Sequence, residues 1–255
     1  MTSKPIFKRL SLLTGSETMA ALEKSHVIVF GLGGVGSWCA EALVRSSVGS
    51  ISLVDFDTVC ITNSNRQIQA LSSTIGRLKA EVLEERLKDI NPSCKLRSFP
   101  LVFSKNTAEL FDISEADYVI DAIDMITSKL DLIESAFYSG KRLFSSMGMG
   151  KKLDPTQIKV ADIWKSSGCP LARLVRQGLK KRGFRGHFPV VYSSEQPRRE
   201  LAGETSVEED VSAGQGGGKR PIGSAVPVTA TAGMTLASLV IRDIYERFSP
   251  QEPYE

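Results

Sequence analysis

Residues 27–38 read VIVFGLGGVGSW, which joins a β-branched apolar run to a glycine-rich turn and then to small and apolar residues. Gly31, Gly33 and Gly36 have the spacing G-x-G-x-x-G, and Gly34 lies between them. A strand, a glycine turn and a helix N-terminus together form a phosphate-binding corner, because free backbone N–H groups and the helix dipole favour an anion. The segment therefore predicts a bound phosphate. It leaves open whether that phosphate belongs to a redox dinucleotide or to ATP.

Apolar runs alternate with amphipathic stretches through the first half of the chain. Strands are expected at 26–30, 50–55, 95–100, 117–123 and 142–146, and helices at 35–46, at 74–90, near 106 and from 127. Such alternation predicts a parallel sheet with helices on both faces. The predicted fold class is α/β, with a Rossmann-like doubly wound sheet that is mainly parallel. Its ligand crevice should lie beyond the carboxyl ends of the strands.

After residue 151 the regular alternation of apolar runs and amphipathic stretches ends. Strand-like segments at 157–164 and 188–193 flank a basic amphipathic helix at 169–188, and an uncharged apolar segment occupies 222–241. Residues 195–221 are polar and rich in glycine, which is typical of a mobile loop. We therefore expect a nucleotide-binding core with an N-terminal arm at 1–150. A C-terminal extension at 151–255 should pack on the same domain.

Composition and cysteine spacing exclude several classes of protein. Hydrophobic residues make up 42% and charged residues 24% of the 255, as in ordinary globular proteins. The four cysteines contain no C-x-x-C pair, which argues against a zinc site and a disulfide framework. The N-terminus lacks the apolar stretch of a signal peptide, so we expect a cytoplasmic protein. Segment 222–241 is long enough to span a membrane, but its Pro227, glycines and hydroxyl side chains favour a buried or interface helix over a membrane anchor.

Polar residues that follow the second predicted strand separate the two kinds of phosphate ligand. Asp55 stands where a carboxylate binds ribose hydroxyls, about 20 residues beyond the glycines. Asp57, Asn63, Arg66 and Lys79 come next. A dehydrogenase has no evident use for this set, whereas a triphosphate that is cleaved needs cationic donors such as Arg and Lys. The set favours ATP.

Two carboxylates end the fourth predicted strand, in VIDAID. A carboxylate near a triphosphate usually serves a magnesium ion. We expect Asp124 to be the Mg²⁺ ligand and Asp121 to have a structural role.

Several motifs resemble a known family. GLGGVGS, LVDFDTV, TNSNRQ, the G-x-x-K run from Gly76 to Lys79 and VIDAID resemble, in this order, the adenylation domain of ubiquitin-activating enzymes and of bacterial activators of molybdopterin and thiamine sulfur carriers. These enzymes attach AMP to a carboxylate. Within this superfamily the chain is most similar to the tRNA threonylcarbamoyladenosine dehydratases, through FKRLSLLTG, NRQIQAL, INPSC, LDPTQIKVADI, PLARLVRQGLKKRG and VVYSSEQP.

The resemblance implies a reaction and its participants. ATP would activate the threonyl carboxylate of a modified adenosine beside the tRNA anticodon, and the ring would then close with net loss of water. Arg66, Lys79 and Asp124 would be catalytic, with ATP and Mg²⁺ as cofactors. Arg9 would reach the triphosphate of a partner subunit, which makes the enzyme a homodimer. The resemblance leaves open whether sulfur-relay proteins are partners, and DNA binding is not expected.

An intramolecular ring closure needs no nucleophile from the enzyme. This agrees with Val190 and Val191, which stand where some relatives carry Cys, and with Cys169, which stands where an acidic residue is commoner.

A basic run within 169–188 is the expected contact for tRNA, because cationic side chains bind phosphate backbones through counterion release. We expect it to form a stripe near the mouth of the ATP crevice; the alternative is a solvated helix face. Its members are Arg173, Arg176, Lys180, Lys181, Arg182 and Arg185.

Three other functions are weighed against a tRNA-modifying cyclase. The first alternative is a sulfur-carrier adenylyltransferase that activates a C-terminal glycine, although the pair of C-x-x-C motifs usual in that group is absent. The second is a non-catalytic RNA-binding module, which the intact triphosphate residues disfavour. NAD-dependent redox chemistry is the most distant.

Overall fold

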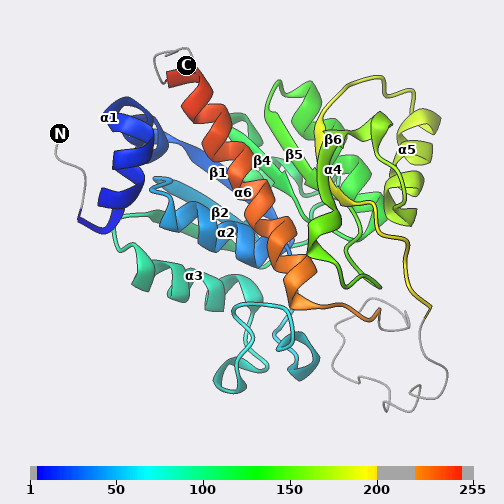
Figure 1. Cartoon of the computed structure of the whole chain (residues 1–255), viewed down its shortest axis with the longest axis horizontal. Helices are drawn as coiled ribbons and strands as arrows, with labels where there is room; N and C mark the ends of the chain where they lie inside the picture. The colour runs from blue at the N-terminus through cyan, green and yellow to red at the C-terminus, as the bar shows by residue number, and fades with distance from the viewer. Residues whose placement is uncertain (1–4, 200–221, 249–255) are drawn as a thin grey trace.

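The computed structural model describes residues 5–199 and 222–248, which fold around one seven-stranded sheet (Figure 1). The strand order across the sheet is β3-β2-β1-β4-β5-β7-β6. The strands are β1 (His26–Phe30), β2 (Ser50–Val54), β3 (Lys95–Phe99), β4 (Tyr118–Asp121), β5 (Arg142–Ser146), β6 (Ile158–Asp162) and β7 (Pro189–Ser193).

All neighbouring strands are parallel except β6, which runs antiparallel to β7. The chain winds outward from β1 through β2 to β3, and then returns to β4 on the other side of β1. This reversal creates a topological switch point between β1 and β4, where ligands bind in doubly wound folds. The predicted fold class is confirmed.

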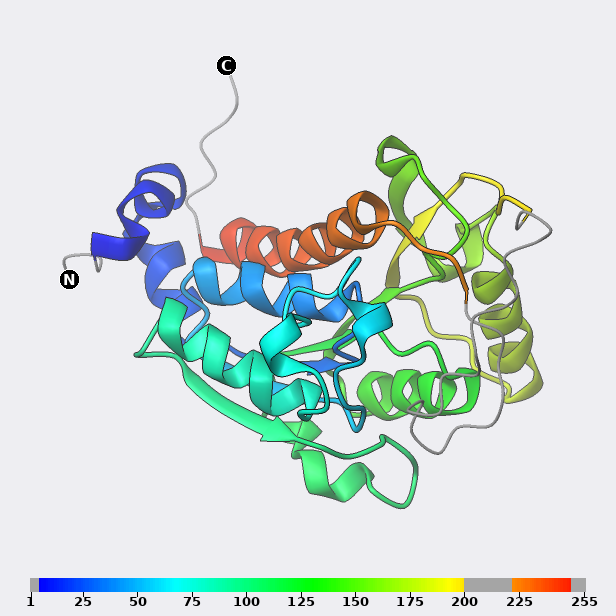
Figure 2. The ribbon, with the colours of Figure 1, turned by 90° about the horizontal axis from the view of Figure 1, so that it is seen from below.

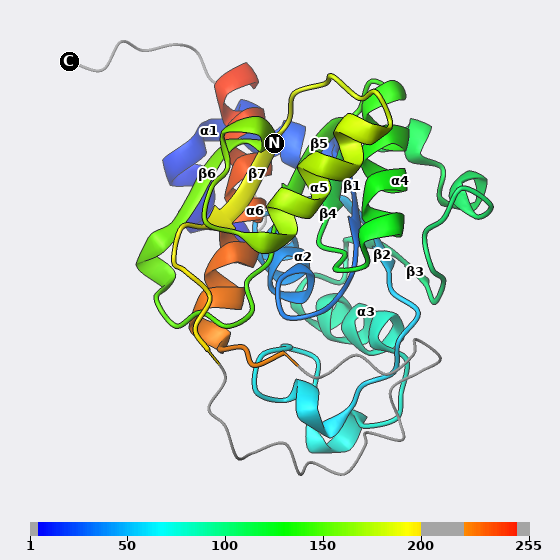
Figure 3. The same ribbon diagram turned by 90° about the vertical axis from the view of Figure 1, so that its right-hand side faces the viewer.

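Helices cover both faces of the sheet, because side chains along each central strand alternate between them. Val27 and Val29 of β1 pack into one hydrophobic cluster, and Ile28 and Phe30 pack into the other. The first cluster is covered by α1 (Lys8–Lys24), α2 (Gly36–Arg45), α3 (Lys79–Ile90) and α6 (Val226–Phe248). The second is covered by α4 (Ile126–Tyr138) and α5 (Pro170–Lys181), which lie together in Figure 3.

Short 3₁₀ helices occupy several connections. They span Pro5–Phe7, Ile61–Asn63, Ser72–Thr74, Ala108–Phe111, Ile113–Glu115, Pro155–Gln157 and Ile163–Lys165.

Three helices differ from the sequence-based expectation. Helix α1 was not predicted at all. Helix α3 begins at Lys79 rather than at residue 74, because Gly76 adopts a left-handed φ of 85° that ends the preceding turn. The basic helix α5 ends at Lys181 rather than at residue 188, because Gly183 has a φ of 73° and reverses the chain.

The apolar segment near the C-terminus forms α6, which lies along α2 (Figure 2). Gly233 makes this close approach possible, since a Cβ at this position would lie 2.4 Å from the carbonyl oxygen of Val35. Val228, Leu236 and Val240 are fully buried on the same helix. No helix in residues 5–199 and 222–248 is long and apolar enough to cross a membrane.

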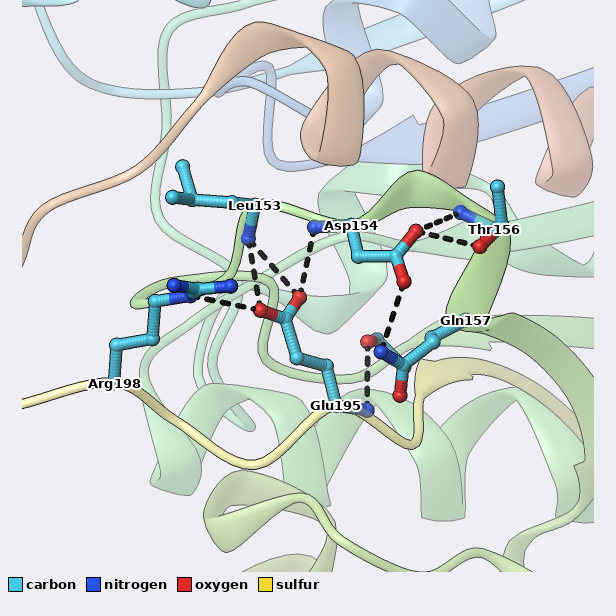
Figure 4. A network of polar contacts seen from close by, with 7 residues as sticks. Leu153, Asp154, Thr156, Gln157, Glu195 and Arg198 are labelled. Carbon is cyan, nitrogen blue, oxygen red and sulfur yellow. Dashed lines mark hydrogen bonds and ion pairs between the residues drawn. The ribbon is translucent and has the colours of Figure 1, made fainter.

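The C-terminal extension adds β6 and β7 to the sheet of the core, and a polar clamp within the extension joins its segments 153–154 and 195–198 (Figure 4). Glu195 accepts hydrogen bonds from the backbone N–H groups of Leu153 and Asp154, at 3.0 and 2.9 Å, and pairs with Arg198 at 3.1 Å. These bonds hold the pKa of Glu195 below its ordinary value. The prediction of a mobile loop is therefore wrong for Glu195, which is buried, and residues 200–221 lie outside the described part of the chain.

Lys151 joins the two chain segments that border residues 200–221. Its backbone N–H donates to the carbonyl oxygen of Gly223, and its own carbonyl oxygen accepts from the N–H of Arg198, both at 2.8 Å. The described chain therefore ends and resumes beside one residue.

Candidate functional site

The glycine turn after β1 is the floor of the site, and two of its glycines are required by packing. Gly31 has a φ of 85°, and a Cβ there would lie 2.7 Å from the carbonyl oxygen of Ala122. A Cβ on Gly36 would lie 1.8 Å from the carbonyl oxygen of Gly31. No side chain fits at either position without moving the backbone.

Gly33 differs from these two glycines, because the folded chain gives no steric reason for it. In residues 5–199 and 222–248, apart from the chain neighbours of Gly33, an added Cβ would meet one atom within 4 Å, Nε2 of Gln67 at 3.9 Å. The described protein therefore leaves open space beside Gly33. Space next to free backbone N–H groups at a helix N-terminus is what a phosphate occupies.

The loop from β2 to α3 is tied to the glycine turn at several points. The indole Nε1 of Trp38 donates to the carbonyl oxygen of Arg66 at 2.9 Å, and Nε2 of Gln69 donates to that of Leu32 at 2.7 Å. Gly34 faces the side chain of Arg66, with 3.1 Å between the Cβ position and Cγ. The loop is therefore held against the turn, with its polar residues near the crevice.

Asp55 ends β2 beside the turn. Its Oδ2 accepts from the N–H of Leu32 at 2.7 Å, and its Oδ1 accepts from the N–H of Asp57 at 2.9 Å. Burial raises the pKa of Asp55, and the charge of Lys79 acts in the opposite direction. Each carboxylate oxygen keeps a lone pair, so the geometry is compatible with the predicted ribose contact.

Cationic groups follow on the same loop. Nζ of Lys79, at the start of α3, lies 2.8 Å from Oδ2 of Asp57, and the lysine side chain is only 7% exposed. Arg66 donates to the carbonyl oxygen of Thr62 at 2.9 Å, and burial lowers the pKa of its guanidinium group. Asn63 accepts from the N–H of Cys60 at 3.1 Å and so shapes the first turn of the loop.

The β4–α4 loop carries Asp124 on the other side of the crevice. Asp124 is exposed, and its charge acts on Arg66, raising the arginine pKa against the effect of burial. The two sides of the crevice therefore present opposite charges to each other.

Asp121 supports this loop from below. Its Oδ2 lies 2.8 Å from Nζ of Lys129 and accepts from Oγ of Ser145 at 2.6 Å. Both charged side chains are fully buried, and Lys129 also donates to the carbonyl oxygen of Ile123 at 2.9 Å. This agrees with the structural role expected of Asp121. Sequence reasoning missed Lys129, and a lysine on an amphipathic helix gives no signal of burial.

The structure does not bring Arg9 to the crevice of its own chain. Arg9 is exposed on α1, which leads into the first residue of β1. The helix therefore lies at the edge of the sheet where β1 begins (Figure 1), whereas ligands of doubly wound folds bind where the strands end.

The basic helix α5 runs away from the crevice, so the prediction of a stripe near the crevice mouth is wrong for most of its members. At its start, Sγ of Cys169 lies 3.7 Å from the carbonyl oxygen of Gly148, just beyond β5. After its end, the chain reaches the beginning of β7. Of the six basic residues, Arg173 is the nearest to the start of the helix, Lys180 and Lys181 lie at its end, and Arg185 follows it.

Three members of the basic run have contacts within the protein. Nζ of Lys180 lies over the ring of Trp164, 5.9 Å from its centroid. Arg176 donates to the carbonyl oxygen of Ser166 at 2.9 Å. Arg182 pairs with Asp131 and Glu134 at 2.7 and 2.8 Å and joins α5 to α4. These two arginines stabilise the fold, which leaves fewer free cations than the sequence suggests.

Comparison with known proteins identifies the family of this chain. A family model described as ThiF matches residues 7–249. The chain belongs to the ThiF family. It is 40% identical to a tRNA threonylcarbamoyladenosine dehydratase of Bacillus subtilis, over 93% of this chain and 94% of that protein.

Two solved structures of the tRNA N6-threonylcarbamoyladenosine dehydratase of E. coli are also similar to this ThiF-family chain. The complex with AMP has a TM-score of 0.83 and 32% identity, and covers 97% of this chain and 98% of that one. The complex with ATP has a TM-score of 0.81 and 34% identity, and covers 94% of each chain. The family predicted from the sequence motifs is confirmed.

The contrast between the glycines gives a first prediction. Gly36→Ala should destabilise the fold by about 2–4 kcal/mol, because the new Cβ collides with backbone. Gly33→Ala should leave the melting temperature nearly unchanged and weaken ATP binding, since its Cβ enters the ligand space. Thermal unfolding and calorimetric titration of both variants test this. Normal ATP affinity in Gly33→Ala would contradict it.

Proposed function

We propose that this protein is an ATP-dependent tRNA threonylcarbamoyladenosine dehydratase, which cyclises the modified adenosine next to the anticodon. The observation that carries the proposal is the crevice: open space at Gly33 is bordered by the loop that holds Arg66 and Lys79. Similarity to a dehydratase over nearly the full length of both chains supports the same assignment and disfavours a sulfur-carrier adenylyltransferase.

The residues of the crevice fit a nucleotide triphosphate. The phosphates would lie over the glycine turn, and Asp55 would accept from a ribose hydroxyl. Asn63, Arg66 and Lys79 would bind the phosphate oxygens. Lys79 is already held in place by Asp57, so a phosphate that replaces or joins this carboxylate needs little reorganisation of the lysine side chain.

The chemistry of the substrate explains why ATP is required. A carboxylate oxygen is a poor leaving group. When this oxygen attacks the α-phosphorus of ATP, pyrophosphate is released and the oxygen becomes part of AMP, which is a good leaving group. Closure of the ring by a nucleophile of the same substrate then expels AMP, which carries the oxygen away. The reacting groups are held together, so the enzyme needs only to orient them. Among its cysteines, Cys39, Cys94 and Cys169 are buried, which agrees with a mechanism without an enzyme nucleophile.

Asp124 is the residue that would hold Mg²⁺. No group of three or more potential metal ligands occurs in the described ranges, and Mg²⁺ in nucleotide sites usually binds one or two carboxylates together with phosphates and water. An exposed carboxylate opposite Arg66 fits this pattern. When bound, the ion would neutralise charge on the phosphates, while Asp124 fixes its place.

A partner subunit would complete the site. Arg9 is exposed on α1, which leads into the start of β1 rather than the end where ligands bind, so we propose that it acts across a homodimer. The basic residues on and just after α5 that form no ion pair within the described residues would hold the tRNA along the flank of the protein: Arg173, Lys180, Lys181 and Arg185. A tRNA substrate agrees with a reaction in the cytoplasm.

The central test is nucleoside analysis of tRNA before and after incubation with enzyme and ATP. Wild-type protein should convert threonylcarbamoyladenosine into a product lighter by one water. Lys79→Ala and Arg66→Ala should each lower this turnover at least about 100-fold, as expected for loss of a group that stabilises transition-state charge. Their circular dichroism should match the wild type. Undiminished turnover in either variant would refute the assignment.

Mixed dimers test the role of Arg9. Arg9→Ala and Lys79→Ala should each be inactive as pure dimers. Mixed subunits should regain activity, because one of the two sites in a heterodimer then has both residues intact. An Arg9→Ala dimer with full activity, or a mixture without recovery, would argue against action across the interface.

Salt dependence tests the binding of tRNA by α5. The double variant Lys180→Gln/Lys181→Gln should bind tRNA more weakly, and the slope of log affinity against log salt should fall by about one for each tRNA phosphate that the variant no longer neutralises. Arg182→Gln removes a charge that is already paired with Asp131 and Glu134, so its slope should match the wild type. Equal slopes for all three proteins would mean that α5 is only a solvated face.

A further inference from the structure

Gln67 is a buried side chain whose amide oxygen has no hydrogen-bond partner among the described residues. It follows Arg66 in the loop that borders the crevice and is 6% exposed. Within the described residues, its Oε1 is inaccessible to solvent and has no hydrogen-bond partner. A buried amide oxygen without a partner costs about as much free energy as a lost hydrogen bond, so such groups are uncommon without a reason.

The amide of Gln67 points to the one open position of the glycine turn. Among the described residues other than the chain neighbours of Gly33, Nε2 is the only atom within 4 Å of the place where a Cβ of Gly33 would lie, at a distance of 3.9 Å. A ligand group that fills the space beside Gly33 must therefore come into contact with this amide. The backbone of the turn favours an anion in that space.

Gln69, two residues later, is a second buried glutamine of the same loop, and its amide has a different role. It is 1% exposed and also has an unpartnered Oε1 among the described residues. Its Nε2, however, donates to the carbonyl oxygen of Leu32 at 2.7 Å and so fastens the loop to the turn. Gln69 thus has a structural hydrogen bond, and the amide of Gln67 faces ligand space.

We propose that Gln67 is a nucleotide-binding residue whose amide N–H donates to a phosphate oxygen lying over Gly33. This inference rests on the proposed use of ATP and adds a donor outside the Arg and Lys set. The amide is neutral, so it can donate to an anionic oxygen without bringing a further positive charge to the site. It therefore positions the phosphate while Lys79 stays beside Asp55 and Asp57.

The near-isosteric change Gln67→Met separates a binding role from a structural one. It removes both the donor and the unsatisfied oxygen, so the melting temperature of the nucleotide-free protein should stay the same or rise. The dissociation constant of ATP should increase about tenfold, as expected for one hydrogen bond to a charged oxygen. Whether the dissociation constant of AMP increases as well depends on which phosphate is contacted. Weaker binding of both nucleotides would place the contact at the α-phosphate. Weaker binding of ATP alone would place it at the β- or γ-phosphate.

Two matched variants sharpen the test. Gln69→Met makes the same change but breaks the bond to Leu32, so its nucleotide-free melting temperature should fall. Gln67→Glu keeps the shape of the side chain and adds a negative charge, so at neutral pH it should weaken ATP binding more than Gln67→Met does. Nucleotide affinity within about twofold of wild type in both Gln67 variants would overturn the inference. Wild-type protein that binds neither ATP nor AMP would instead defeat the proposed function itself.

Discussion

The contact between Gly36 and the carbonyl oxygen of Gly31 is the constraint on which the rest of the molecule depends. Because no side chain separates them, α2 begins directly above the end of β1. Gly31 in turn lies against the backbone of Ala122, which fixes the end of β4 beside the same turn. Two strands and a helix therefore meet without intervening side chains, and the crevice opens where they meet.

The parts of the fold that sequence predicts best are those that periodicity determines locally. The buried strands alternate sharply with amphipathic helices, and β1, β2, β4 and β5 occur where the pattern places them. Helix boundaries were less predictable, because they depend on single backbone conformations at Gly76 and Gly183. The course of α5 could not be predicted, since it follows from the antiparallel pairing of β6, which no local pattern reveals.

The candidate site divides in the same way. Charged residues that follow a strand were predictable as a group, because parallel strands bring their carboxyl ends together. Their supports were not: Trp38 holds Arg66, and Lys129 holds Asp121, through contacts that only the folded chain creates. Arg182 shows the opposite error, since a charge that looked free in the sequence is already paired with two carboxylates of α4. A pattern of charges shows which groups are present, and pairing decides which of them remain available.

Lys151 has a consequence for which feature of a residue the protein uses at this position. Its two hydrogen bonds, to Gly223 and from Arg198, both use backbone atoms. The residue has a positive φ of 61°, a conformation that glycine adopts more readily than lysine. The junction between these two segments is therefore set by the backbone conformation of residue 151, and it is indifferent to the charge of the side chain.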